Sequence, residues 1–272
     1  MTKKRVLIIL IITLVLALIG VLFGAVFCLK NQTVVVVGED VTYTNQAIIE
    51  TAGLKQGSSI FLLDKDKAIE RVEKTFPDLK VIQIKTLNPI SIEIKVRKRY
   101  ETYYYKYLGQ YYVLDEDLKV LSIKENAEDV QNLIEITLNL DNINETTNVT
   151  DFVGSNAQKN MSYNLFVAIY ETQYENKTDT IKDAHNKMSS LISSISFDLG
   201  YTINGQAFNR LIITTKQGMK FDIGKATEEL ERKINVCFAV LNDDEVLDNT
   251  KGKVEITYNS ENKEIVNFYK GE

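Results

Sequence analysis

The stretch GLKQGSSIFLLD, from Gly53 to Asp64, decides the fold class, because its glycines fit either a phosphate-binding loop or a turn between two helices. A phosphate-binding P-loop has four residues between its glycines, followed by Lys and then Ser or Thr. Here three residues separate Gly53 from Gly57, and Ser58 stands where the lysine belongs. We therefore interpret the glycines as turn residues and expect the apolar residues 60–63 to pack beneath them.

The residues on both sides of this turn predict a β-α-α-β-β order. The run VVVVG at residues 34–38 is typical of a short buried strand. Thr44 and Asp64 are typical caps for two helices, since a side-chain oxygen can accept an N–H of the first turn, and Pro77 ends the second helix. The segments KVIQIKTL and ISIEIKVR, joined through Asn88–Pro89, predict two strands, and the second alternates apolar with polar residues. This order predicts a small α+β domain.

The N-terminus predicts a membrane-spanning helix. The segment MTKKR at residues 1–5 is basic, and residues 6–29 contain no charged side chain. A helix of these 24 residues would be about 36 Å long, enough for a hydrocarbon core of about 30 Å. A cleaved signal peptide is the alternative, although its apolar region should be shorter. Because the basic residues precede the span, we expect a single-pass protein with residues 1–5 in the cytoplasm and residues 31–272 outside the cell.

Composition and charge exclude one large class of partners. The chain has 32 basic and 37 acidic side chains, a net charge of −5, and a hydrophobic content of 44% that is typical of a folded protein. A nucleic-acid binder would instead need basic residues clustered along a phosphate track. Cys28, in the expected span, and Cys237 are not expected to form a disulfide. Cys237 falls in an amphipathic pattern at 226–241 and is predicted to be a buried core residue.

Residues 100–272 predict a second, mainly β domain with helices. Seven of the 14 tyrosines fall between Tyr100 and Tyr112. We interpret them as strand residues on a half-buried sheet, with a ligand-stacking surface as the alternative. The segments KVEITY and EIVNFYK predict a closing hairpin. Other strands are expected at 103–107, 111–114, 195–199, 210–215 and 220–223, and helices near 165–170, 181–191 and 226–241.

Catalytic and metal-binding patterns are scarce in the sequence. His185 is the single histidine, so a zinc site is not expected, and the strained nucleophile elbow G-x-S-x-G is absent. The acidic runs at 115–117 and 243–245 are interpreted as solvated turns. A pair of carboxylates for sugar hydrolysis stays open, because such partners meet only in the fold. We therefore predict no catalytic, cofactor-binding or metal-binding residues.

The segments VVVVG, GLKQGSSIFLLD, FPDLKVIQI and SIEIKVRKR, placed after a single N-terminal span, resemble the FtsQ/DivIB family of bacterial cell-division proteins. The β-α-α-β-β unit is similar to the POTRA domain of that family and is placed at residues 31–99. A looser resemblance continues through YYVLDEDLKVL and LIITTKQGMKFDIG into residues 100–272. The resemblance thus implies an α+β protein with one transmembrane helix at 6–29, a POTRA domain and a larger, mainly β domain.

The resemblance also implies a function. Proteins of this family are divisome scaffolds without catalytic activity, which bind small coiled-coil division proteins of the FtsL and FtsB/DivIC type. Through these partners the protein is expected to help position or regulate septal peptidoglycan synthesis at the division septum, without a cofactor. The alternative is a membrane-anchored cell-wall hydrolase or transferase, which two converging carboxylates in a deep cleft of the second domain would favour.

The resemblance implies that partners bind at the closing strands. In the family a tyrosine, a serine two residues later and a Val-x-aromatic motif occur there, and Tyr258, Ser260 and residues 266–268 match this pattern. An edge strand has unpaired N–H and C=O groups that an incoming strand can satisfy. The alternative is that Tyr258 and Phe268 are core residues of a hairpin. The expected partner-binding residues are Tyr258, Ser260, Ile265, Val266, Phe268 and Tyr269.

Overall fold

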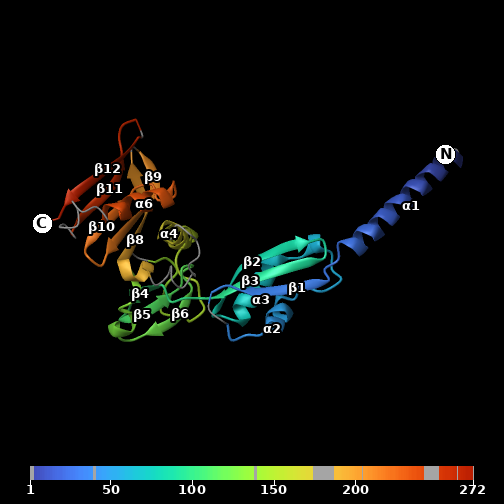
Figure 1. The fold of residues 1–272 in the computed structure, drawn as a ribbon, viewed down its shortest axis with the longest axis horizontal. Coiled ribbons are helices and arrows are strands. Elements are labelled where there is room, and N and C mark those ends of the chain that lie inside the picture. Colours follow the sequence, from blue (N-terminus) through green and yellow to red (C-terminus); the bar gives the residue numbers. More distant parts are fainter. Residues whose placement is uncertain are drawn as a thin grey trace. The chain divides into compact units, whose positions relative to one another are not determined.

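The chain divides into two compact units, Met1–Arg99 and Tyr100–Glu272, each with its own hydrophobic core (Figure 1). The first unit is a small mixed domain preceded by a helix, and the second is larger and mainly β. The predicted α+β fold class is therefore confirmed. The computed structural model describes residues 3–38, 41–137, 140–173, 187–203, 205–241, 251–261 and 263–271.

The chain begins with helix α1 (Lys3–Val26), whose described apolar side chains are exposed. This helix ends three residues before the predicted end of the membrane span at residue 29. Residues 27–29 instead belong to the small domain, because the Ile60 N–H donates to the Phe27 carbonyl (2.9 Å) and Leu29 is fully buried in its core. Within the part of the chain that the structure describes, no helix combines the length and the apolarity needed to cross a membrane. The membrane span and its topology therefore stay predictions.

A three-stranded sheet and two helices form the small domain. Its strands are β1 (Asn31–Val36), β2 (Leu79–Asn88) and β3 (Ser91–Lys98), in the order β1-β3-β2. β1 runs parallel to β3, and β2 runs antiparallel to it. Helices α2 (Asn45–Ala52) and α3 (Lys65–Thr75) lie between β1 and β2 in the chain. The β-α-α-β-β order expected from the sequence is thus observed.

The turn between the helices has the structure that its glycine predicts. The Thr44 hydroxyl accepts the Ala47 N–H (3.2 Å) at the start of α2, and Gly53 ends the helix with a left-handed φ of 63°. The 3₁₀ helix η1 (Ile60–Leu62) follows, and Asp64 then caps α3 by accepting the Lys67 N–H (3.1 Å). Local capping by short polar side chains therefore sets the ends of both helices.

The predicted alternation of β3 divides its side chains between two faces. Ile92, Ile94 and Val96 are fully buried, and they form one core with residues of both helices. Glu93 and Lys95, which lie between them, are less buried, whereas Arg97, which follows Val96, is buried. The helix residues in this core include Ile48, Ala52, Ala68 and Val72.

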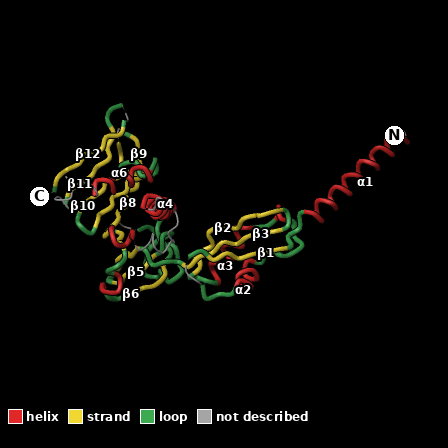
Figure 2. The backbone as a smooth tube through the Cα atoms, in the orientation of Figure 1, coloured by secondary structure: helices red, strands yellow, loops and turns green. Residues whose placement is uncertain are grey.

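A nine-stranded sheet forms the second domain, in the order β12-β11-β10-β9-β8-β7-β4-β5-β6 (Figure 2). Three neighbouring pairs are parallel, β10 with β11, β7 with β8 and β4 with β7, and the other five are antiparallel. The strands are β4 (Tyr103–Tyr107), β5 (Gln110–Leu114), β6 (Val120–Lys124), β7 (Ile134–Ile136), β8 (Ile192–Ile203), β9 (Gln206–Thr215), β10 (Met219–Ile223), β11 (Gly252–Tyr258) and β12 (Glu264–Lys270).

Helices α4 (Asn156–Gln173) and α6 (Leu230–Leu241) pack against each other and against the sheet, α4 on β8 and α6 on β10. The rings of Phe221 on β10 and Phe238 on α6 lie 5.4 Å apart. α6 begins at Leu230 rather than at the predicted residue 226, because the Ala226 N–H donates to the carbonyl of Asn209 on β9 (2.9 Å). A shorter 3₁₀ helix, η2 (Ala127–Val130), follows β6.

The tyrosine-rich run forms strands on a half-buried sheet, as predicted. Tyr103, Tyr105 and Tyr112 are buried in the core, whereas Tyr104 and Tyr111 lie half-buried on the other face, with ring centroids 5.9 Å apart. Buried and less buried side chains alternate along β4 with the period of two expected for a strand. Most of these tyrosines are therefore explained by packing.

One acidic run is not the solvated turn that the sequence suggested. Asp115 and Glu116 are fully buried, and the Asp115 carboxylate accepts the N–H groups of Asp117 (2.9 Å) and Lys119 (2.8 Å). The carboxylate satisfies turn amides that would otherwise be buried without partners. The second acidic run at 243–245, His185 and most of the helix expected at 181–191 lie outside the described residues.

A candidate protein-binding edge strand

β12 forms one edge of the nine-stranded sheet. Within the described residues β11 is its one neighbour, and the two strands pair antiparallel along their whole length (Figure 1). The Asn259 side chain accepts the N–H groups of Glu261 (3.0 Å) and Lys263 (2.8 Å), which holds the connecting turn. A short, braced turn fixes the register of a hairpin, so it also determines which side chains reach the edge.

Hydrogen bonds at the two ends of this hairpin show which backbone groups face the open side. The Asn259 N–H donates to the Lys263 carbonyl (2.9 Å), and the Gly271 N–H donates to the Lys251 carbonyl (2.9 Å). In antiparallel strands, pairs that exchange backbone hydrogen bonds alternate with pairs that do not. Continued between these ends, the alternation directs the N–H and C=O groups of four β12 residues away from β11. These residues are Glu264, Val266, Phe268 and Lys270.

Four of the seven residues of β12 are large apolar side chains with considerable exposure. Val266 and Phe268 lie opposite buried core residues of β11, yet they are 44% and 40% exposed. Ile265 and Tyr269 lie on the other face of the strand and are 41% and 49% exposed. Natural proteins usually protect apolar edge strands, because such edges pair with other chains. β12 therefore combines outward backbone groups with apolar side chains on both faces.

Tyr258 lies on β11, the strand next to the edge strand β12, and is half-buried. Lys233 Nζ donates to the Tyr258 hydroxyl (2.8 Å), and Lys225 Nζ lies 4.5 Å from the centroid of its ring. Burial raises the pKa of Tyr258 to about 12, so the hydroxyl stays protonated at neutral pH. Two lysines thus hold this ring in place, and Tyr258 supports the edge rather than forming it.

The first turn of α6 holds the start of β12. Arg232 Nη2 donates to both carboxylate oxygens of Glu264 (2.7 Å each), and these hydrogen bonds raise the pKa of Arg232 above its ordinary value. Lys233 is almost fully buried, and burial lowers the pKa of its ammonium group. That ammonium also donates to the Lys225 carbonyl (2.6 Å). Lys233 Nζ also lies 4.0 Å from Glu264 Oε2, so Arg232 and Lys233 both tie α6 to the beginning of β12.

Ion pairs cross the other face of the sheet and reach β12. Arg210 Nε on β9 donates to Asp222 Oδ1 on β10 (2.6 Å), and Lys253 Nζ on β11 lies 3.0 Å from Asp222 Oδ2. Lys253 also pairs with Glu255, which in turn accepts the Tyr269 hydroxyl (3.2 Å). The network links four neighbouring strands through alternating charges, and it ends at an exposed residue of the edge.

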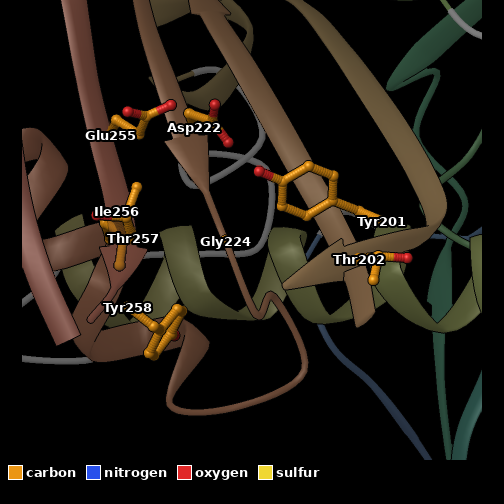
Figure 3. Close-up of a pocket in the computed structure, with 8 residues that line it drawn as sticks. All are labelled: Tyr201, Thr202, Asp222, Gly224, Glu255, Ile256, Thr257 and Tyr258. Atoms are coloured by element: carbon orange, nitrogen blue, oxygen red, sulfur yellow. The ribbon is translucent and has the colours of Figure 1, made fainter. Parts of the chain in front are cut away.

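A pocket of about 200 Å³ opens where β10 has ended, at Gly224. In Figure 3, Asp222 and Glu255 lie close together at one end of it and Tyr258 at the other. Gly224 approaches β11 so closely that a Cβ atom would lie 2.5 Å from the Ile256 carbonyl oxygen. Only glycine fits there without displacing β11. The lining residues are Tyr201, Thr202, Asp222, Gly224, Glu255, Ile256, Thr257 and Tyr258.

The two carboxylates of this pocket bear on the hydrolase alternative. Sugar hydrolysis needs one carboxyl group that stays protonated because its pKa is raised. Burial acts to raise the pKa of Asp222, but hydrogen bonds from Arg210 and Lys253 outweigh it and hold the pKa below its ordinary value. Lys253 contacts Glu255 as well. This pair therefore belongs to a structural ion-pair network, and Asp222 is unsuited to act as a general acid.

The opposite edge of the sheet is partly covered. The N–H of Val120 on β6 donates to the Asp151 carbonyl (2.8 Å), and the Thr150 N–H donates to the Val120 carbonyl (2.8 Å). A loop therefore already satisfies both backbone groups of Val120. Of the two outer strands, β12 offers the longer row of outward backbone groups.

The structure gives no candidate for metal or thiolate chemistry in its described part. Among the described residues, no three His, Cys, Asp or Glu side chains are placed to hold a metal ion. Cys28 and Cys237 are both thiols. Cys237 is fully buried, as predicted, and burial raises its pKa to about 12, which disfavours the reactive thiolate.

The six residues expected at the partner site fall into three settings. Tyr258 is half-buried on β11, and Ser260 is exposed in the turn. The other four lie on β12 and are Ile265, Val266, Phe268 and Tyr269. No local sequence pattern indicates the residues that brace the edge, because their charges lie far apart in the chain. Those residues are Arg210, Asp222, Arg232, Lys233 and Lys253.

Comparison with known proteins agrees with this architecture. Residues 29–99 match the family model of the POTRA domain, FtsQ-type, so the protein is a POTRA-domain protein, and the described residues of its second domain form a nine-stranded sheet with β12 at one edge. The chain is also 23% identical over 260 residues to the cell division protein DivIB of Clostridium botulinum. This alignment covers 94% of the chain and 90% of that relative. Both comparisons support the FtsQ/DivIB family of cell-division proteins.

Proposed function

We propose that this chain is a divisome scaffold without catalytic activity of its own. In this proposal β12 binds a strand of an FtsL-type or FtsB/DivIC-type division protein, and through it the scaffold helps position or regulate septal peptidoglycan synthesis. One observation carries the proposal: β12 is an edge strand with four exposed apolar side chains. The match to the FtsQ-type POTRA domain and the similarity to DivIB support a role in cell division.

Strand addition explains why apolar and backbone groups are exposed together. An incoming strand would pair with the N–H and C=O groups of Glu264, Val266, Phe268 and Lys270, and these bonds would give affinity for an extended segment. Phe268 and Val266 would then fill alternate pockets of the partner on one face, while Ile265 and Tyr269 would do so on the other. Aromatic residues are enriched among those that dominate binding energy.

We also propose that α1 anchors the protein in the cell membrane, with the two domains outside the cell. The support is chemical: residues 6–29 contain no charged side chain, and the described apolar side chains of α1 are exposed. Three basic residues precede this segment, which favours a cytoplasmic N-terminus. A scaffold held in this way would meet single-span partners in the same membrane.

A binding titration tests the edge strand directly. The full-length chain, reconstituted in lipid nanodiscs, is titrated with the ectodomain of an FtsB/DivIC-type protein. Phe268→Ala should weaken binding by about 2 kcal/mol, roughly 30-fold in Kd, because it removes an exposed aromatic anchor while the domain stays folded. Unchanged affinity would remove Phe268 from the site, and loss of folding would make it a core residue.

A pair of proline variants tests the backbone contribution. In Val266→Pro the lost N–H faces the open side, so the hairpin should survive while partner binding falls. In Asn267→Pro the lost N–H faces β11, so the hairpin itself should be destabilised. If Val266→Pro bound the partner as well as the native chain, strand addition at β12 would be wrong. Depletion of the protein in cells should produce filaments, and a tagged copy should form bands at midcell.

A further inference from the structure

The small domain has an apolar tip, which we define as Phe61, Leu62 and Leu87. Their exposed fractions are 70%, 84% and 49%. Phe61 and Leu62 belong to η1, and Leu87 lies at the end of β2. Large apolar side chains that are exposed side by side mark contact sites for other molecules or for membranes.

Hydrogen bonds fasten one half of the tip to the residues that follow α1. The Ile60 N–H donates to the Phe27 carbonyl (2.9 Å), and the Leu29 N–H donates to the Ser58 carbonyl (2.9 Å). The rings of Phe27 and Phe61 lie 5.1 Å apart. Because α1 ends at Val26, the side chains of η1 are held next to the point where the apolar helix meets the domain.

The other half of the tip lies at the same end of the domain. The Lys30 N–H donates to the Ile90 carbonyl in the turn between β2 and β3 (2.8 Å). Lys65, which follows η1, donates through Nζ to the Thr86 hydroxyl (3.1 Å). These contacts bring the end of β2, with Leu87, to the junction with α1, and Figure 2 shows the ends of β2 and β3 beside that junction.

We infer that the apolar tip inserts into the interface of the lipid bilayer that α1 enters. This inference rests on the anchoring role proposed above for α1. Phe61 contacts Phe27, the residue that directly follows α1, so a bilayer that holds α1 would lie next to Phe61 and Leu62. Aromatic and aliphatic side chains at such positions bind at the headgroup boundary.

Charge around the tip fits the same occupant. Lysine side chains flank apolar surfaces at membrane interfaces, where their ammonium groups reach the headgroups while their stems cover apolar atoms. Lys55 and Lys85 lie near the tip in the chain and are exposed, and Lys30 is exposed just after the junction with α1. The tip would add a second membrane contact to α1 and so restrict rotation of the POTRA domain about the junction.

Tryptophan fluorescence can test this insertion, since the chain contains no tryptophan. Leu62→Trp places a single fluorophore in the tip, at a side chain exposed enough to be replaced without disturbing the core. Ile82→Trp is the matched control, because Ile82 is also exposed but lies five residues from Leu87 along β2, about 17 Å away. Both full-length variants are reconstituted in phosphatidylcholine vesicles with and without brominated lipid.

We expect Leu62→Trp to show a blue-shifted emission and to lose most of it to brominated lipid, while Ile82→Trp keeps its emission. Flotation of the vesicles reports the anchor separately. If the chain floats with the vesicles but the two variants are quenched equally, the inference is wrong and the anchor stands. If the chain does not float, the anchor fails and the inference fails with it. Protection of Leu62→Trp that appears only when a partner ectodomain is added would assign the tip to a protein and overturn the lipid assignment.

Discussion

Asp222 is an almost fully buried carboxylate that binds two cations at once. Arg210 and Lys253 approach it from the two neighbouring strands, and Lys253 continues to Glu255 on β11. The cost of burying this charge is offset only while both partners are in place. At the scale of single residues, the stability of the sheet beside β12 therefore depends on charge pairing as well as on apolar packing.

Asp222→Asn should lower the free energy of unfolding by about 1–3 kcal/mol, because charged hydrogen bonds to Arg210 and Lys253 are lost. The folded state holds the pKa of Asp222 below its ordinary value, so its stabilising effect is present above the unfolded pKa and is lost as the pH falls below about 4. The native chain should therefore lose stability in acid more steeply than the variant. Chemical denaturation at a series of pH values measures both effects.

Asp198→Asn is the control for this prediction. Asp198 lies 3.8 Å from Arg210 Nη1 and is considerably more exposed than Asp222. Exposed ion pairs stabilise folded proteins by about 1 kcal/mol or less. Equal losses in the two variants would contradict a special role for the buried carboxylate.

At the scale of elements, β3 shows how a strand assigns its faces. The period of two in ISIEIKVR places Ile92, Ile94 and Val96 in the core between the sheet and helices α2 and α3. A one-residue slip would turn these side chains outward. The sequence is sufficient to predict which face of β3 is buried, because the apolar and polar residues that specify the two faces are neighbours in the chain.

Ile94→Asp should unfold the POTRA domain or destabilise it by several kcal/mol, on the order of the 5–15 kcal/mol of a whole domain, because it buries an unpaired carboxylate. Lys95→Asp is the control on the opposite, less buried face and should have a much smaller effect. Thermal unfolding of both variants measures the difference. An unchanged transition in Ile94→Asp would show that the faces of β3 are assigned wrongly.

At the scale of the whole molecule, the expected topology can be read with an impermeant thiol reagent. Ser260→Cys in a Cys28→Ser background places a reactive thiol in the exposed β11–β12 turn. Cys237 should stay unlabelled, since it is fully buried and burial raises its pKa to about 12. An impermeant maleimide should label Ser260→Cys in intact cells whose outer surface is accessible.

Thr2→Cys in the same background is the topological control, because residues 1–5 are expected in the cytoplasm. It should be labelled only after the membrane is broken. If Ser260→Cys also required lysis, the two domains would lie on the cytoplasmic side and the proposed meeting with partners outside the cell would fail.

Several features of the fold could be predicted from short stretches of sequence. Thr44, Gly53 and Asp64 set helix ends through contacts within a few residues, and the alternation in β3 assigns its buried face. The resemblance to the FtsQ/DivIB family also rested on such local segments. The closing hairpin was predicted because both of its strands and its turn are contiguous.

The sequence by itself determined the order of elements in the POTRA domain, the closing hairpin and the kind of residue at its edge. Only the tertiary structure decided that β11 lies parallel to β10, that Arg232 and Lys233 hold the start of β12, and that Asp115 is buried. It also decided that Tyr258 is half-buried while Phe268 is exposed. The physical reason is one of range: caps, turns and strand periodicity act between neighbours, whereas strand order, buried charge pairs and edge exposure depend on residues that meet only when the chain has folded.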